Sequence, residues 1–297
     1  MKYLIPIVTL SFMSCKQDTP PSSLDLTQQV RAFVEHTQSN VTGCDVQGIL
    51  HPGRPDCNLD DYSAGPGGFG CLSGDEQACR TMALTIAEDG KPYRSYKNRI
   101  EGDSENEYSR DQLYGFVAYL VKTKDIENAG RLLNYIKRTG RLCDNPDDNR
   151  CDLTPAAWGL LSKTWRYLDL PRNSSMIVND AVDDTVVLTQ VQTVEIGYQL
   201  GLQVEFVFLA KQMGLDTALL RSAARIAWDR QPKNPFYCYT VEGTSDTCKK
   251  LYLEWFKEGT PSGSRTQWSL ARDQEEVQAR RDSMGYEALF LGRLLLK

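Results

Sequence analysis

Histidine is scarce in this chain, which has only His36 and His51 in 297 residues. Catalysis by a serine–histidine–aspartate triad is therefore disfavoured, and no G-x-S-x-G motif is present. A lyase that depends on histidine is disfavoured for the same reason. The chain also lacks any C-x-x-C pair, and its two histidines are too far apart for the usual ligand spacing of a zinc site. No metal or other cofactor is expected.

An excess of basic residues is also absent. The formal net charge is −5, so the chain has no positive field to attract nucleic acid, and we expect no nucleic-acid partner. A phosphate-binding loop is missing as well. The glycine-rich stretch Gly65–Gly70 is not followed by G-K-[ST], and the sequence predicts turns there, within a long loop over residues 40–72.

The N-terminus has the composition of an export signal. Residues 1–14 contain one early lysine, a short apolar run and then small residues before Cys15. The run is too short to span a bilayer, which needs about 20 residues. The segment resembles a bacterial lipoprotein signal, although Phe12 replaces the usual leucine-like residue. That resemblance implies cleavage before Cys15, lipidation of Cys15, and a lipid anchor on a membrane, in the periplasm or at the cell surface. An ordinary signal peptide with an incidental cysteine is the alternative.

Residues 15–23 are polar and contain two prolines, which is typical of a tether, and residues 24–297 are expected to form a single domain. Eight cysteines remain after Cys15, and they occur in near pairs. Pairing of neighbours along the chain is the simplest of the many possible connectivities, and it suits an oxidising compartment. The expected disulfides are Cys44–Cys57, Cys71–Cys79, Cys143–Cys151 and Cys238–Cys248.

Apolar periodicity predicts about nine helices and little strand, and hence an all-α fold built from helical hairpins. The expected helices cover residues 24–39, 75–87, two helices between 109 and 139, then 154–168, 193–213, 216–228, 246–256 and 284–296. Residues 176–189 contain β-branched runs that fit either short strands or the start of the helix at 193. The acidic loop 142–152 departs from the calcium-binding loop pattern, and a disulfide-closed solvated loop is the simpler interpretation.

The clearest helix start lies at Ser109–Gln112. The spacing of these two residues is that of a capping box, and Asp111 falls in the first turn, where the helix dipole favours a negative charge. One interpretation is a cap with a solvated Arg110–Asp111 ion pair. The other is that the helix start presents Tyr108, Arg110 and Asp111 into a cleft.

Three segments resemble those of exported proteins with an (α/α) toroid, an architecture shared by many glycoside hydrolases and polysaccharide lyases. They are Tyr108–Gln112 (YSRDQ), Asn234–Tyr237 (NPFY), and Gln267–Arg272 (QWSLAR) leading into Ser283–Glu287 (SMGYE). The resemblance covers about residues 100–297. It implies a partial toroid stapled by local disulfides, and it assigns no catalytic residue.

Candidate catalytic residues follow from side-chain chemistry. Glycoside hydrolysis needs two carboxyl groups that face each other across the sugar. Asp111 is the first candidate for acid or base, with Asp103, Glu107 or Glu287 as the second group. Tyr108 is the proton-transfer candidate for a Tyr–Arg lyase. The candidate substrate-binding residues are Arg110, Tyr237, Gln267, Trp268, Arg272 and Tyr286.

Several alternatives stay open at this stage. Trp268 and Tyr286 also fit ordinary core packing. Glu195 and Glu205 lie on the expected helix at 193–213, and both are expected to be solvated. The competing function is a non-catalytic surface lipoprotein that binds glycan or protein. A pocket with two carboxyl groups would favour a carbohydrate-active enzyme acting on polysaccharide, and a simple Arg110–Asp111 pair would favour a structural role.

Overall fold

The structure is a computed structural model, which describes residues 25–41, 43–51, 57, 59, 62–102, 108–170, 180–256, 270 and 285–297. Within these ranges 70% of the residues are helical and 4% are in strands, so the expected all-α class is confirmed. The first elements are α1 (Leu26–Asn40), β1 (Cys44–Val46), β2 (Ile49–His51), η1 (Ser63–Gly67), α2 (Gly68–Ser73), α3 (Glu76–Ala83), α4 (Tyr96–Glu101), α5 (Arg110–Thr123) and α6 (Ile126–Thr139). The remaining ones are η2 (Asn149–Cys151), α7 (Pro155–Tyr167), α8 (Asp180–Thr193), α9 (Tyr198–Gln212), α10 (Ala218–Arg230), α11 (Pro235–Glu242), α12 (Asp246–Phe256) and α14 (Gly285–Leu295).

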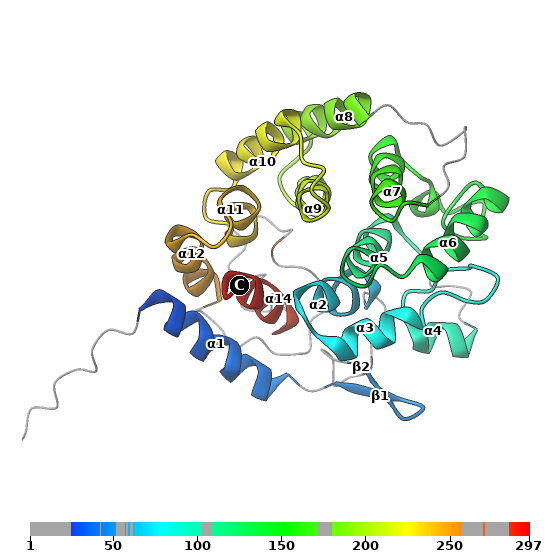
Figure 1. Cartoon of the computed structure of the whole chain (residues 1–297), viewed down its shortest axis with the longest axis horizontal. Helices are drawn as coiled ribbons and strands as arrows, with labels where there is room; N and C mark the ends of the chain where they lie inside the picture. The colour runs from blue at the N-terminus through cyan, green and yellow to red at the C-terminus, as the bar shows by residue number, and fades with distance from the viewer. Residues whose placement is uncertain are drawn as a thin grey trace, which may run out of the picture.

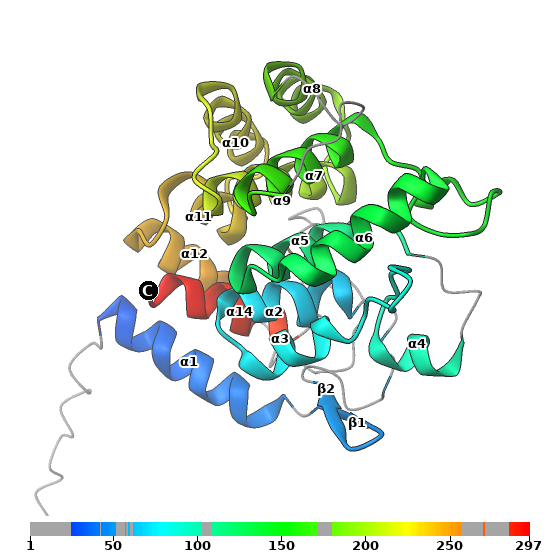
Figure 2. The same ribbon diagram turned by 45° about the vertical axis from the view of Figure 1, so that its right-hand side comes forward.

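The helices are arranged with one group toward the middle of the molecule and another around it (Figure 1). Helices α2, α5, α9, α11 and α14 lie nearer the middle, and α1, α3, α6, α8, α10 and α12 lie at the periphery. Most helices of the first group pack against the peripheral helix next to them in sequence, as in the pairs α2–α3, α9–α10 and α11–α12. The last helix, α14, packs against the first, α1, so the two ends of the described fold meet (Figure 2).

The buried apolar side chains of the described residues form one core. Helix α5 is buried on all sides from Gln112 to Val121, and α9 is buried from Gln203 to Ala210. These two helices therefore have no solvated face along these segments, and any polar side chain they carry there must be accommodated inside the protein.

Several helix starts have the expected local chemistry. The Asp125 side chain accepts a hydrogen bond from the Asn128 backbone N–H at 3.0 Å and caps α6. Thr154 caps α7 in the same way, with Pro155 at the first helical position, as the sequence predicts. These caps satisfy backbone N–H groups that have no partner within the helix.

The predicted capping box of α5 is wrong. At α5 the Ser109 side chain does not cap the helix, because its hydroxyl donates to the Asp111 carboxylate instead. The Gln112 side chain is buried, and its Oε1 accepts from the Ala64 backbone N–H at 3.0 Å. The helix expected to begin at residue 216, α10, has Thr217 as its cap. The Thr217 hydroxyl accepts from the Leu220 N–H at 3.3 Å, while Asp216 pairs with an arginine.

The expected long loop over 40–72 is also corrected. It contains the β1–β2 hairpin, the η1 turn and α2, and residues 62–70 are all buried. The glycines have a packing role here. A β-carbon on Gly68 would overlap the backbone of Gly115, and one on Gly115 would overlap the carbonyl oxygen of Ser63. Glycine therefore permits the close approach of this segment to α5.

The helix expected at 193–213 is two helices, α8 and α9. They are separated at residues 194–197, where Gly197 has a φ of 125°, a conformation that favours glycine. Of the two β-branched runs, residues 185–188 belong to α8 and form no strand, and residues 176–178 lie outside the described residues. Helix α11 was not expected, although its start is explicable. Asn234 accepts hydrogen bonds from the backbone N–H groups of Phe236 and Tyr237, and Pro235 holds the first helical position.

All four disulfides join cysteines that are neighbours along the chain, so the predicted pairing is confirmed: Cys44–Cys57, Cys71–Cys79, Cys143–Cys151 and Cys238–Cys248. The third closes the acidic loop after α6, as expected. The second joins α2 to α3, and the fourth joins α11 to α12.

A buried ion pair connects α7, α8 and the start of α10. The Lys163 ammonium lies 3.0 Å from the Asp184 carboxylate, and the two side chains are 0% and 1% exposed. The Thr217 hydroxyl donates to the other oxygen of Asp184 at 2.8 Å. Each charge compensates the burial of the other, so removal of only one is expected to be costly.

Substitution of Gly115 by alanine should destabilise the fold by about 1–3 kcal/mol, because the added methyl group overlaps the Ser63 carbonyl. Gly130 is the matched control, since it also lies inside a helix and a β-carbon there would meet nothing within 4 Å. Gly130→Ala should be neutral or stabilising by about 0.5–1 kcal/mol. Urea unfolding of both variants measures this, and equal effects would contradict the close packing.

Substitution of Lys163 by methionine should lower the free energy of unfolding by about 3–5 kcal/mol, because the Asp184 carboxylate loses its counter-charge. The double variant Lys163→Met, Asp184→Leu should recover much of that loss, since it also removes the Asp184 carboxylate that the single variant leaves without its counter-charge. The measurement is a denaturant-unfolding cycle over the three variants. A double variant no more stable than the single one would show that the pair is not coupled in this way.

Candidate functional site

Three carboxyl groups, on three of the helices nearer the middle of the molecule, interact through their charges. Asp111 lies in the first turn of α5, Glu205 in the middle of α9, and Glu287 near the start of α14. The pKa of Glu205 is raised well above its ordinary value, first by burial and then by the negative charges of Asp111 and Glu287. The charges of the three side chains therefore interact, and we call these three residues the carboxyl cluster.

Glu205 is a buried member of the carboxyl cluster. Its side chain is 6% exposed, and the residues that follow it on α9, Phe206 to Ala210, are 2% exposed or less. The cause of the pKa shift is physical: an ionised carboxylate loses its hydration in such surroundings, while the protonated form loses much less. Glu205 was expected to be solvated, and that expectation is wrong.

Two tyrosines lie close enough to Glu205 to respond to its charge. The pKa of Tyr114 and the pKa of Tyr237 are both raised, first by burial and then by the nearby Glu205. Tyr114 is three residues after Asp111 and so lies near it on the surface of α5. The Tyr237 hydroxyl is buried and has no hydrogen-bond partner within the described residues. Because Tyr237 is fully buried, its ring is not presented for stacking on a sugar.

Asp111 forms the more accessible part of the carboxyl cluster. Its side chain is half-buried, and it accepts a hydrogen bond from Ser109. Arg110 points elsewhere: its guanidinium donates to the backbone carbonyls of Asn149 and Asp152, at 3.2 and 3.4 Å, on the disulfide-closed loop. Within the described residues Arg110 and Asp111 are thus not simply paired to each other, which was the arrangement expected for a purely structural role.

Tyr108 is placed unfavourably for proton transfer. Its side chain is 1% exposed, and its hydroxyl donates to the backbone carbonyl of Gln112 at 2.9 Å. Burial and the negative charge of Asp111 raise the pKa of Tyr108 well above its ordinary value, although Arg94 acts in the opposite direction. A phenol in this state is a poor base at neutral pH.

Tyr286 and Glu287 begin the last helix and are both buried. Glu287 Oε1 accepts a hydrogen bond from the Leu270 backbone N–H at 3.2 Å. The Tyr286 hydroxyl lies against the glycine-rich turn, where a β-carbon on Gly65 would overlap it. The burial of Tyr286 agrees with the core-packing interpretation. The remaining candidates lie outside the described residues: Cys15, Asp103, Glu107, Gln267, Trp268 and Arg272.

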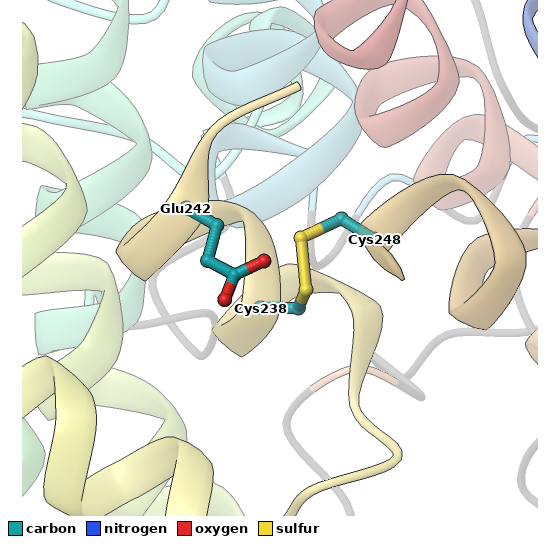
Figure 3. Close-up of side chains that lie close together, drawn as sticks. All are labelled: Cys238, Glu242 and Cys248. Carbon is teal, nitrogen blue, oxygen red and sulfur yellow. A yellow bond between two sulfur atoms is a disulfide. The ribbon is translucent and has the colours of Figure 1, made fainter. Parts of the chain in front are cut away.

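A second group of side chains has the composition of a metal site. The sulfur atoms of Cys238 and Cys248 and a carboxylate oxygen of Glu242 lie within 4.8 Å of one another (Figure 3). The two sulfurs are joined as a disulfide, whereas metals bind the thiolate. The Ser245 hydroxyl completes the contacts, 2.9 Å from Glu242 and 3.1 Å from Cys248 Sγ. The group thus connects α11 to α12 and, in this oxidised state, offers no thiolate to a metal.

Comparison of the chain with protein-family models, with curated proteins and with solved structures gave no match. A search of the described residues for membrane-spanning helices found none that combines the necessary length and apolar character. Functional inference therefore depends on the geometry and electrostatics of the carboxyl cluster.

Substitution of Glu205 by glutamine should raise the free energy of unfolding above that of wild type, and this gain should be larger at neutral pH than at pH 4. In the unfolded chain Glu205 ionises near the ordinary glutamate pKa of 4.5, whereas in the folded state its pKa is raised well above that value. Wild-type stability should therefore fall as the pH rises above about 4.5, until the folded-state pKa is passed. Glutamine does not ionise, so Glu205→Gln lacks this pH-dependent loss of stability.

The measurement is urea unfolding of both proteins between pH 4 and 8. The stability advantage of Glu205→Gln over wild type should grow with pH. Glu195→Gln is the control, since Glu195 is a more accessible carboxylate close by in the sequence, and its difference from wild type should stay constant. A constant difference for Glu205→Gln would show that Glu205 ionises normally in the folded protein.

Proposed function

We propose that the protein is a carbohydrate-active enzyme that hydrolyses glycosidic bonds at the carboxyl cluster. The observation that supports this is the raised pKa of Glu205 beside Asp111 and Glu287. Glycoside hydrolysis needs one carboxyl group that still holds its proton at working pH and a second that acts as base or nucleophile. When two nearby carboxyl groups have different environments, one can stay protonated and act as the acid. The other is then ionised and acts as base or nucleophile.

In this proposal Glu205 is the general acid. Its protonated carboxyl group donates to the oxygen of the glycosidic bond as the bond between that oxygen and the anomeric carbon breaks. Asp111 is the base or nucleophile, because it is the more accessible carboxylate of the cluster. As base it takes a proton from the water that attacks the anomeric carbon. The negative charge of Glu287, which accepts a hydrogen bond from the Leu270 N–H, contributes to the raised pKa of Glu205.

We further propose that the helices form a partial (α/α) toroid. The pairing of successive helices and the contact of α14 with α1 support this architecture. In such an arrangement the inner helices carry the site, which agrees with the positions of Asp111, Glu205 and Glu287 on α5, α9 and α14.

Export and lipidation at Cys15 are likewise proposals. Four disulfides among the described residues favour an oxidising compartment, and the sequence before Cys15 favours attachment to a bacterial membrane, in the periplasm or at the cell surface.

The test is release of reducing sugar from a panel of neutral and uronic polysaccharides. Wild type should be active on at least one substrate. Glu205→Gln and Asp111→Asn should each lower kcat by about 10²–10⁴-fold, because each removes an acid–base or nucleophilic group. Glu195→Gln should retain full activity. Ultraviolet absorbance of an unsaturated product is recorded in parallel, since it would indicate elimination in place of hydrolysis.

Two outcomes would contradict the proposal. If the variants fold and keep wild-type rates, the carboxyl cluster is not the catalytic site. If wild type releases nothing from any substrate yet binds glycan, the protein is a glycan-binding lipoprotein and the carboxyl cluster has a non-catalytic role.

A further inference from the structure

A cavity of about 710 Å³ lies among α9, α10 and the end of α11. These three helices lie side by side in both ribbon views (Figures 1 and 2). Its volume is within the range of sites that bind small molecules. The cavity, which we call the α10 pocket, is lined in part by Val207 of α9. Val207 is two residues from Glu205 and thus roughly 200° around the helix, so it faces away from Glu205.

The charge of the α10 pocket is opposite to that of the carboxyl cluster. Its lining contains the cations Lys211, Arg221 and Arg225, and Asp216 as the carboxylate. Arg221 is paired with Asp216 at 3.1 Å. Lys211 and Arg225 have no carboxylate partner within the described residues. Two uncompensated positive charges in one concave site, on a chain whose net charge is −5, are complementary to an anion.

Both of these cations are held in place by other contacts. The Lys211 ammonium donates to the backbone carbonyls of Thr240 and Val241, at 2.9 and 3.4 Å, near the end of α11. The Arg225 guanidinium lies over the ring of Trp228, 5.0 Å from its centroid. These contacts restrict the two side chains before a ligand arrives, which reduces the entropy lost on binding.

The rest of the lining includes apolar side chains, among them Val207, Ala224 and Ile226. A fitting ligand therefore combines an anionic group with a less polar body. A planar carboxylate matches the donor geometry of the arginine, and a sugar ring offers C–H groups to the apolar wall.

We propose that the α10 pocket binds a carboxylate-bearing ligand of sugar size, a uronate, at a site separate from the carboxyl cluster. The pocket would hold an acidic residue of a polysaccharide on the outer side of α9, while the bond to be cleaved lies elsewhere. The binding itself does not depend on the proposed hydrolysis.

The test is calorimetric titration of the whole protein with oligogalacturonate, with a neutral galactose oligomer of equal length as the control ligand. Oligogalacturonate should bind, and the neutral oligomer should bind at least about tenfold more weakly. The affinity should fall as salt is raised, because the cations are exposed to solvent. Butyrate is a third ligand, and binding as tight as that of oligogalacturonate would overturn the uronate assignment in favour of a site for small carboxylic acids in general.

Arg225→Gln and Lys211→Met should each weaken oligogalacturonate binding by at least about tenfold, through loss of a charge-assisted hydrogen bond. Arg138→Gln is the matched control, because Arg138 is also an exposed helical arginine over an aromatic ring, that of Tyr135. It should bind as wild type does. Glu205→Gln should also bind normally, which separates this proposal from the proposed catalysis. Equal binding of the neutral oligomer, absent binding, or unchanged affinity in Arg225→Gln would each overturn the proposal.

Discussion

Burial of the Glu205 carboxyl group beside two other carboxyl groups is the constraint on which the centre of the fold depends. An isolated charge in such a position is strongly unfavourable, so the pKa of Glu205 is raised well above its ordinary value. The neighbouring helices α5 and α11 carry Tyr114 and Tyr237, which lie close enough to Glu205 to respond to its charge. Such an arrangement lowers stability at neutral pH, and proteins usually retain a feature of this kind at a functional site.

Helices α5 and α9 can hold this group because they are buried on all sides, from Gln112 to Val121 and from Gln203 to Ala210. Close contact of the η1–α2 segment with α5 is possible only because glycines stand at Gly68 and Gly115. The Cys238–Cys248 disulfide joins α11, which carries Tyr237, to α12. Polar tyrosine and carboxyl groups therefore stay in fixed positions inside an apolar core, where electrostatic interactions are stronger than in water.

The peripheral helices other than α8 were predictable because one face of each is solvated and their starts have ordinary caps. Helix α6 shows both features, with Asp125 as its cap. The burial of side chains on α9 was harder to predict from the sequence. Because α9 is buried on every side, it lacks the periodic apolar pattern that would distinguish a buried glutamate from a solvated one. Glu205 was therefore missed, while Asp111 was found from its place in a first turn and Glu287 from a motif near the C-terminus. The Gly65–Gly70 stretch was misassigned because glycine marks close packing as well as turns.

The most direct measurement is the protonation state of Glu205 in the folded protein. Carbon-detected NMR of protein labelled at the glutamate side-chain carboxyl carbon would follow every glutamate with pH, and Glu205→Gln would assign the relevant resonance. We expect the Glu205 resonance to keep its protonated shift at neutral pH, well above the ordinary pKa of glutamate. A Glu205 resonance that titrates in the usual acidic range would contradict the carboxyl cluster as an acid–base site.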